Sequence, residues 1–157
     1  MPRDLQVLED VYGDRAAMRW VGDGEPLTRA QCEEWLQVTQ ANYRTRGYGM
    51  FALEERSTGA VVGFCGLVHP GGQPDVEVKY ALLRAHWGRG LATEAVSALL
   101  GFAHAVLGIE CAIATVAPDN VASHRVLTKA GMTQRVPRHN PDGSITHVFQ
   151  WHAPVAR

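Results

Sequence analysis

The sequence predicts a three-layer α/β or α+β fold, in which a mixed β-sheet is flanked by helices, and three observations lead to it. Segments with helical spacing of apolar residues alternate with extended segments along the chain. Hydrophobic residues make up 46% and charged residues 20%, as in globular proteins. The length of 157 residues matches one ordinary domain, so we expect residues 1–157 to form a single domain.

The N-terminal part carries two helical segments separated by a loop. Apolar residues repeat at helical spacing in residues 4–12, and a glycine follows. Glycine and proline in residues 22–26 predict a loop. Thr28 and Gln31 have the spacing of a capping box, in which each side chain satisfies a backbone N–H of the first helical turn. We therefore expect a long helix that begins at Thr28 and ends near Gly47.

Extended segments dominate the middle of the chain. Residues 48–55 and 60–68 are two such segments, and the Arg-Ser-Thr-Gly sequence between them is typical of a hairpin turn. Residues 69–74 contain two prolines and two glycines and are expected to form a loop. Residues 76–83 alternate in side-chain direction as a strand does, with Glu77 and Tyr80 on opposite faces.

The C-terminal half alternates helices and strands. The expected elements are a helix at 91–107, a strand at 111–116, a helix at 120–130 and a closing hairpin. The hairpin pairs the segment around Val136 with residues 145–151 across an Asn-Pro-Asp-Gly turn.

Composition excludes several classes of function. The chain has 15 basic and 16 acidic residues, and this net charge of −1 argues against a nucleic-acid or anionic-membrane binder. It has no membrane-length apolar run and no signal peptide, so we expect a cytoplasmic protein. Three separated cysteines and seven histidines show no metal-ligand spacing, so we expect neither a disulfide scaffold nor a metal site.

A glycine-containing loop precedes the helix at 91–107. Gly88 and Gly90 let the backbone turn tightly and approach a ligand, and the N–H groups of the following helix favour an anion. The loop matches neither a P-loop nor a dinucleotide fingerprint. Taken alone, it predicts either a phosphate-bearing ligand or a simple strand-to-helix turn.

Two motifs in order carry a resemblance to a known family. The run at 87–95 is Trp-Gly-Arg-Gly-Leu-Ala-Thr-Glu-Ala, and an Asp-Asn-x-x-Ser stretch at 119–123 leads to Gly131. Together they resemble the GNAT superfamily of acyl-CoA N-acetyltransferases, over about residues 4–151. Trp87 stands where the superfamily usually has Arg or Gln, which resembles the RimJ/RimL-like branch, the ribosomal-protein N-terminal acetyltransferase type.

The resemblance implies a site for acetyl-CoA. The pyrophosphate would be held by the backbone N–H groups of the loop and the first helical turn, namely Gly88, Arg89, Gly90, Leu91 and Ala92. Arg89 would either add a charge-assisted contact or be solvated. Trp87 would pack under the loop. The pantetheine arm would pair with backbone groups of Ala81, Leu82 and Leu83 where the strands at 76–83 and 111–116 splay apart. Asn120 would reach the pantetheine or only cap its helix.

The implied reaction is direct attack of a primary amine on the thioester in a ternary complex. The amine must be neutral, and Glu77 is the expected base. The alternatives are that Glu77 is only a cross-strand or solvent-facing carboxylate, or that a water chain serves as the base. A backbone N–H near Leu82 would donate to the oxyanion. Many family members use a tyrosine acid where this chain has Leu127, so Ser123 is the candidate acid, unless it is only a helix-surface or capping serine.

Alternative functions remain open at this level. The acceptor is an amine on a protein N-terminus or on a small molecule. A second possibility is a catalytically silent acyl-CoA-binding or sensing module of the same fold, because Leu127 cannot donate a proton. A third is the binding of an unrelated phosphorylated ligand.

The start of the chain departs from the family pattern. The family begins with a strand before the first helix, whereas this sequence opens almost inside that helix. Either Met1 is internal to the gene product, or the sheet lacks its first strand and exposes the segment at 48–55 as an edge. An exposed edge invites pairing with another chain, so we expect a homodimer unless a loop covers the edge.

Overall fold

The computed structural model describes residues 2–21 and 24–156. Gly22 and Asp23 of the expected loop lie outside the described residues. The chain divides into two compact units, which are described in turn. The first comprises Met1–Val68 with Lys79–Leu91, and the second comprises His69–Val78 with Ala92–Arg157.

The first unit begins with three helices, α1 (Pro2–Tyr12), α2 (Arg15–Met18) and α3 (Arg29–Arg46). Both parts of the expected capping box at Thr28 are present, and Gly47 ends α3 in the left-handed conformation. The predictions for α1 and α3 are confirmed. The short helix α2 was not predicted, because four residues are too few to show a period. It begins where the Asp14 side chain accepts a hydrogen bond from the Ala16 N–H.

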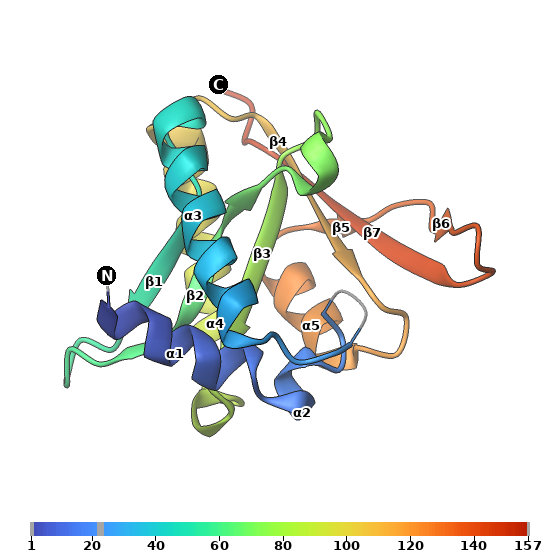
Figure 1. Ribbon diagram of the computed structural model, residues 1–157. Helices are drawn as coiled ribbons and strands as arrows, with labels where there is room; N and C mark the ends of the chain where they lie inside the picture. Colours follow the sequence, from blue (N-terminus) through green and yellow to red (C-terminus); the bar gives the residue numbers. More distant parts are fainter. Residues whose placement is uncertain (1, 22–23, 157) are drawn as a thin grey trace. The chain divides into compact units, whose positions relative to one another are not determined.

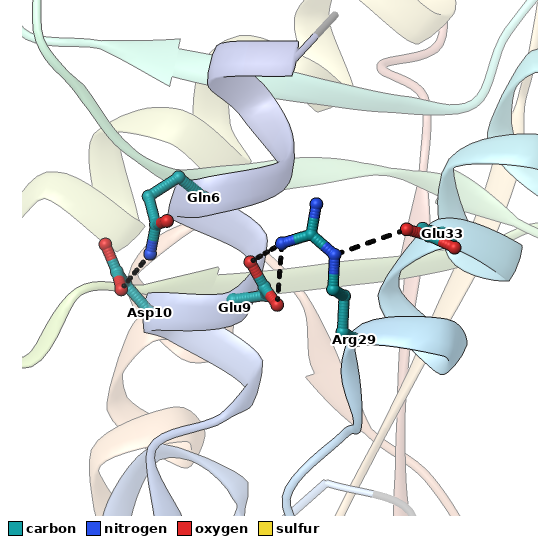
Figure 2. A network of polar contacts seen from close by, with 5 residues as sticks. All are labelled: Gln6, Glu9, Asp10, Arg29 and Glu33. Carbon is teal, nitrogen blue, oxygen red and sulfur yellow. Dashed lines mark hydrogen bonds and ion pairs between the residues drawn. The ribbon is translucent and has the colours of Figure 1, made fainter.

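A surface network ties the first turn of α3 to α1, as Figure 2 shows. The Arg29 guanidinium lies 3.2 Å from Glu9 Oε2 in α1 and 3.4 Å from Glu33 Oε1 in α3. Such solvent-exposed pairs contribute at most about 1 kcal/mol each. The network therefore orients the two helices, whereas burial of apolar side chains holds them.

The core of the first unit lies between helices α1 and α3 and the strands that contain Met50 and Phe64. Tyr12, Trp35 and Phe64 form an aromatic group, with ring centroids 5.7 Å apart for Tyr12–Trp35 and 5.3 Å apart for Trp35–Phe64. The buried residues of this cluster are Leu8, Val11, Tyr12, Met18, Cys32, Met50 and Phe64. The apolar side chains that recur at helical spacing in α1 therefore pack against the strands of this unit.

The strands of the first unit are antiparallel. Strand β1 (Met50–Glu54) pairs with β2 (Val61–Val68), with Phe51 opposite Cys65. Strand β3 (Glu77–Leu82), whose first two residues belong to the second unit, follows, and the N–H of Leu83 donates to the carbonyl of Val62 at 2.8 Å. The helical segment Pro70–Gly72 lies in the expected loop between β2 and β3.

The second unit contains the remaining elements, shown in chain order in Figure 1. They are α4 (Leu91–Ala105, whose first residue belongs to the first unit), β4 (Cys111–Val116), α5 (Val121–Lys129), β5 (Thr133–Gln134), β6 (Arg138–His139) and β7 (Ile145–His152). Strand β4 runs parallel to β3, with Glu77 opposite Ile113, and antiparallel to β7. The sheet is therefore mixed and has the order β1-β2-β3-β4-β7-β5, with β6 paired to β7. This confirms the predicted α/β fold.

The predicted closing hairpin is confirmed, because β5 and β6 both pair antiparallel with β7, but one position within it was predicted wrongly. Val136 lies between β5 and β6, in neither strand, and is 85% exposed. Pro137 follows it and has no N–H to donate to a ladder, which interrupts pairing at this point. The predicted turn is present, because the Gly143 N–H donates to the Asn140 carbonyl at 3.0 Å.

Candidate active site

The loop between β3 and α4 has the geometry of an open backbone cradle. A short helical turn, Arg84–His86, leads into Gly88 and Gly90, whose φ angles are 73° and 75°. A Cβ placed on either glycine would have no atom of the described chain within 4 Å. Space is therefore open beside the backbone here. Helix α4 starts at Leu91 with its unpaired N–H groups next to this space, so the residues present fit an anionic group such as a pyrophosphate.

Arg89 is held by two partners in the first unit. Its Nη2 donates to Glu55 Oε1 at 2.9 Å, and its Nη1 donates to Nδ1 of His86, also at 2.9 Å. Thr58 Oγ1 donates to the other carboxylate oxygen of Glu55 at 3.0 Å. The hydrogen bond from Arg89 is the main reason that the pKa of Glu55 lies below its usual value. The guanidinium thus links the β1–β2 turn to the loop and is not simply solvated.

Trp87 ties the loop back to the end of β3. Its indole N–H donates to the carbonyl of Leu82 at 2.9 Å, although the side chain is 46% exposed. This contact gives a physical role to the residue that stands where the resembled superfamily has Arg or Gln. The indole fixes the loop to the strand with one directed bond.

The end of β3 offers one backbone donor on the edge away from β2. Both backbone groups of Leu83 have partners in the first unit, since its N–H donates to Val62 and its carbonyl accepts from His86. Neighbouring residues of a strand point their N–H groups to opposite edges. The N–H of Leu82 therefore points away from β2. Ala81 shares the direction of Leu83, because its carbonyl lies against Gly63 of β2.

Glu77 is a buried carboxylate in the second unit. The residue is only 2% exposed. Thr115 Oγ1 from β4 donates to its Oε1, and Gln73 Nε2 donates to its Oε2 at 3.2 Å. A hydroxyl and an amide thus hold the two oxygens in a defined orientation. The solvent-facing alternative for Glu77 is therefore wrong, whereas its hydrogen bond with Thr115 of the neighbouring strand fits the cross-strand alternative.

Helix α5 carries the other predicted site residues, also in the second unit. The Asn120 side chain caps the helix, accepting a hydrogen bond from the Ser123 N–H at 3.3 Å. Capping is thus confirmed for Asn120, and its contact with pantetheine stays a prediction. Ser123 is half-buried, and Leu127 is 1% exposed within the core. Leu127 therefore packs where the resembled family places a tyrosine acid.

Sequence reasoning missed Glu55, Thr115 and Gln73. The partners Glu55 and Arg89 are 34 residues apart, and Glu77 and Thr115 are 38 residues apart. No local motif marks such pairs. Only the register of β3 against β4 and the path of the β1–β2 turn bring them together.

The cysteines are structural side chains. All three are free thiols, and Cys32 and Cys65 are buried. Burial raises the pKa of Cys65 to about 12, so its thiolate is not formed at neutral pH. Within residues 2–21 and 24–156, no three His, Cys, Asp or Glu side chains are grouped to hold a metal ion. Over the same residues, no helix is long and apolar enough to cross a membrane.

The strand, loop and helix just described match a known protein family. A family model described as an acetyltransferase (GNAT) domain matches residues 1–133. The chain belongs to the GNAT acetyltransferase family. The protein YkkB of Bacillus subtilis (strain 168) is 36% identical over 108 residues, which are 66% of this chain and 62% of YkkB. The chain thus spans less than two thirds of the length of that relative.

Solved structures have the same GNAT fold. An acetyltransferase from Agrobacterium tumefaciens str. C58 is 28% identical, with a TM-score of 0.73 over 88% of this chain and 82% of that chain. RimL, a ribosomal L7/L12 α-N-protein acetyltransferase solved in complex with coenzyme A, has a TM-score of 0.77. It is 16% identical, and the match covers 96% of this chain and 87% of RimL. At 16% sequence identity, the similarity to RimL shows a shared fold and nothing more.

Proposed function

We propose that this GNAT protein is an N-acetyltransferase that moves an acetyl group from acetyl-CoA to a primary amine by direct attack in a ternary complex. The observation that carries the proposal is the strand end of β3 and the loop that follows it. Leu82 has an N–H directed away from β2, and the glycines at 88 and 90 leave open space before α4. Family membership supports the same reaction class.

Acetyl-CoA supplies the activated acyl carbon as a thioester. In the proposal, the N–H groups from Gly88 to Ala92 bind the pyrophosphate, assisted by the positive end of α4. The Leu82 N–H donates to the acyl oxygen as negative charge develops on it. The two N–H groups at Ala81 and Leu83 are directed to β2, so Leu82 is the preferred donor among these three residues. The solved RimL structure, which has a similar fold, contains coenzyme A, and this supports acetyl-CoA as the acyl donor.

Glu77 is the proposed base. An α-amine has a pKa of about 8 and a lysine amine about 10.4, so each is mostly protonated at neutral pH. The Glu77 carboxylate takes the proton directly or through one water, and Thr115 and Gln73 keep it oriented. Ser123 is the proposed acid for the departing thiolate, acting from the first turn of α5.

The acceptor in this proposal is a protein N-terminus or a small-molecule amine, with the RimJ/RimL-like branch favoured. The Trp-Gly-Arg-Gly run and the Asn-x-x-Ser stretch support that branch. An α-amine also needs less help from a base than a lysine does.

A second candidate is a catalytically silent acyl-CoA-binding module. The buried Leu127 favours it, because it removes the tyrosine acid that many members of the family use. One experiment separates the two functions. The protein is incubated with acetyl-CoA and a panel of peptide N-termini, polyamines and aminoglycosides, and CoA release is measured. Acceptor-dependent release establishes the transferase, whereas acetyl-CoA binding without release for any amine indicates the silent module.

A further inference from the structure

Three arginines line one cavity in the first unit. The cavity has a volume of about 560 Å³, and its lining residues are Arg15, Ala16, Arg19, Gly24 and Arg84. This concentration of positive charge contrasts with the overall net charge of −1. Guanidinium groups match the planar or tetrahedral oxygens of carboxylates and phosphates, which makes Arg the usual side chain of such sites.

Each guanidinium is placed by a neighbour that leaves hydrogen-bond donors for a ligand. Asp14 holds Arg84 through Nε, at 3.0 Å, and through Nη2. Arg15 lies 3.8 Å from Glu25, an ion pair too long for a hydrogen bond. Arg19 stacks on the Trp20 ring, 4.6 Å from its centroid, an arrangement that leaves the in-plane N–H edge open. Among the described residues, the contacts named above set two carboxylates, Asp14 and Glu25, against three guanidinium groups.

The spacing along α2 also favours an anion. Arg15 and Arg19 are four residues apart, with Arg19 still helical at the C-cap, so their side chains leave the same face. Like charges in this arrangement destabilise a helix by a few tenths of a kcal/mol, and an anion between them relieves the repulsion. The residues are exposed, so this arrangement is not required to fill the core.

We propose that this arginine cavity binds a carboxylate or phosphate carried by one of the two substrates. Arg84 is two residues beyond Leu82, so their Cα atoms are at most about 7 Å apart. An anionic group bound beside Arg84 therefore lies near the end of β3, where the proposed acetyl transfer takes place. The statement that the anion belongs to a substrate rests on the proposed acetyl transfer. The statement that the cavity binds an anion does not. The source is either the 3′-phosphate of the donor or an acidic group on the acceptor.

The first experiment uses inorganic phosphate and succinate as probes. Each is titrated into the full chain and followed by ¹H–¹⁵N NMR, including the arginine Nε–H signals. We expect saturable shifts, and at least a fivefold weaker affinity in the Arg15→Gln/Arg19→Gln protein. The matched control is Arg44→Gln/Arg46→Gln, which removes two exposed arginines at the end of α3. The proposed anion site is overturned if both double variants lose affinity for the probes equally. It is also overturned if the wild-type NMR shifts do not saturate. The single variants Arg15→Gln and Arg19→Gln serve if the double variant fails to fold.

The second experiment identifies the source. Calorimetry compares CoA with 3′-dephospho-CoA in the wild type and both double variants. If the wild type and the control variant bind CoA more tightly than 3′-dephospho-CoA but Arg15→Gln/Arg19→Gln does not, the cavity holds the donor's 3′-phosphate. If the two donors bind alike in all three proteins, an acidic acceptor occupies it, and succinate should then compete with the acceptor. If no CoA binds to any of the proteins, the proposed function is wrong. The phosphate titration would still show whether the cavity binds an anion. Loss of the preference in the control variant alone would overturn the assignment to a substrate.

Discussion

Gly90 is the single residue on which proposed donor binding depends most directly. Its φ of 75° is one that L side chains rarely adopt, and a Cβ there would project into open space. The Gly90→Val substitution therefore strains the loop and fills the space in which the proposed site would hold the pyrophosphate. We expect acetyl-CoA affinity to fall more than tenfold, over about 1.4 kcal/mol, as measured by calorimetry.

Gly143→Val is the matched control for this substitution. Gly143 has a φ of 85° and equally open surroundings, but it lies in the turn before β7. Both variants carry the backbone strain, so a loss of affinity limited to Gly90→Val reports on the site. A folded Gly90→Val protein with wild-type affinity rules out a CoA site at this loop.

Glu77 decides how the amine loses its proton in the proposed mechanism. We expect Glu77→Gln to lower kcat while calorimetric binding of acetyl-CoA is kept, because the amide cannot accept the proton. The loss should shrink at high pH, where the amine is already neutral. Steady-state kinetics from pH 6 to 10 measure both effects. Glu110→Gln, which removes an exposed carboxylate from the same unit, is the control. Full activity of Glu77→Gln at pH 7 would transfer the role to water.

Ser123 offers a separate prediction on leaving-group departure. If its hydroxyl protonates the thiolate, Ser123→Ala should lower kcat and leave the Asn120 cap intact, because that cap uses the Ser123 backbone N–H. Single-turnover kinetics with acetyl-CoA measure the step. An unchanged rate would show that the thiolate leaves unprotonated or takes its proton from water.

At the scale of elements, the Glu55–Arg89 pair joins the β1–β2 turn to the loop between β3 and α4. The pKa of Glu55 is lowered from 4.5 by the hydrogen bond from Arg89. A lowered folded-state pKa means that the pair stabilises the protein above pH 4.5, and that this contribution is lost as pH falls through the folded-state value. We expect Glu55→Gln to be less stable than wild type at pH 7, with the difference shrinking below pH 4.5.

Urea unfolding midpoints at pH 7, 5 and 3.5 measure this effect. Glu110→Gln again controls for loss of a carboxylate, since Glu110 is exposed at the surface of the other unit. A stability difference that is constant with pH would show that the Glu55 charge does not contribute and that only its packing does.

Gly63 sets how closely β2 approaches the end of β3. A Cβ on Gly63 would lie 2.4 Å from the carbonyl oxygen of Ala81 and 2.9 Å from Cα of Leu82. Gly63→Ala must therefore push the β3 end away from β2, at a cost of about 1–3 kcal/mol. We expect a lower free energy of unfolding and a higher KM for acetyl-CoA, because Leu82 moves. Unchanged values of both would contradict the close approach.

Gly101→Ala provides the comparison for Gly63→Ala. It lies inside α4, and a Cβ there would have no atom of the described chain within 4 Å. Alanine in a helix interior is favoured over glycine by about 1 kcal/mol. The same chemical change should thus stabilise the protein at one position and destabilise it at the other, as thermal unfolding would show.

At the scale of the whole molecule, we expect the edge strand β1 to decide whether copies of the chain associate. β1 stands at one end of the strand order, as also seen in Figure 1. Because the Leu67 N–H donates to the Gly49 carbonyl, the backbone groups of Met50 and Ala52 point away from β2. Tyr43 OH donates to the Met50 carbonyl at 2.9 Å and so covers part of this edge.

We expect the protein to form a dimer through this edge, because unpaired strand groups favour pairing with a second strand. Light scattering at micromolar concentration measures the mass, and Ala52→Pro, which removes an outward N–H, should shift it to the monomer. A wild-type mass near 17 kDa would contradict the dimer.

Local sequence alone sets the features that depend on neighbouring residues. The capping box of α3, its glycine stop, the turn before β7 and the glycine loop before α4 all follow from residues within a few positions of one another. Hydrogen bonds and φ preferences at this range are properties of the residue types, which is why these predictions could be made. The order of the elements and the resemblance of the two motifs to GNAT proteins belong to the same level.

Tertiary structure decided which distant groups meet. Arg84 pairs with Asp14 70 residues away, and Thr115 holds Glu77 across 38 residues. Strand register and helix placement result from the packing of the apolar core, and a shift of one residue would send each side chain to the other face of the sheet. For that reason the sequence predicted Glu77 as a candidate but not its burial, and the arginine cavity could be found only in the folded chain.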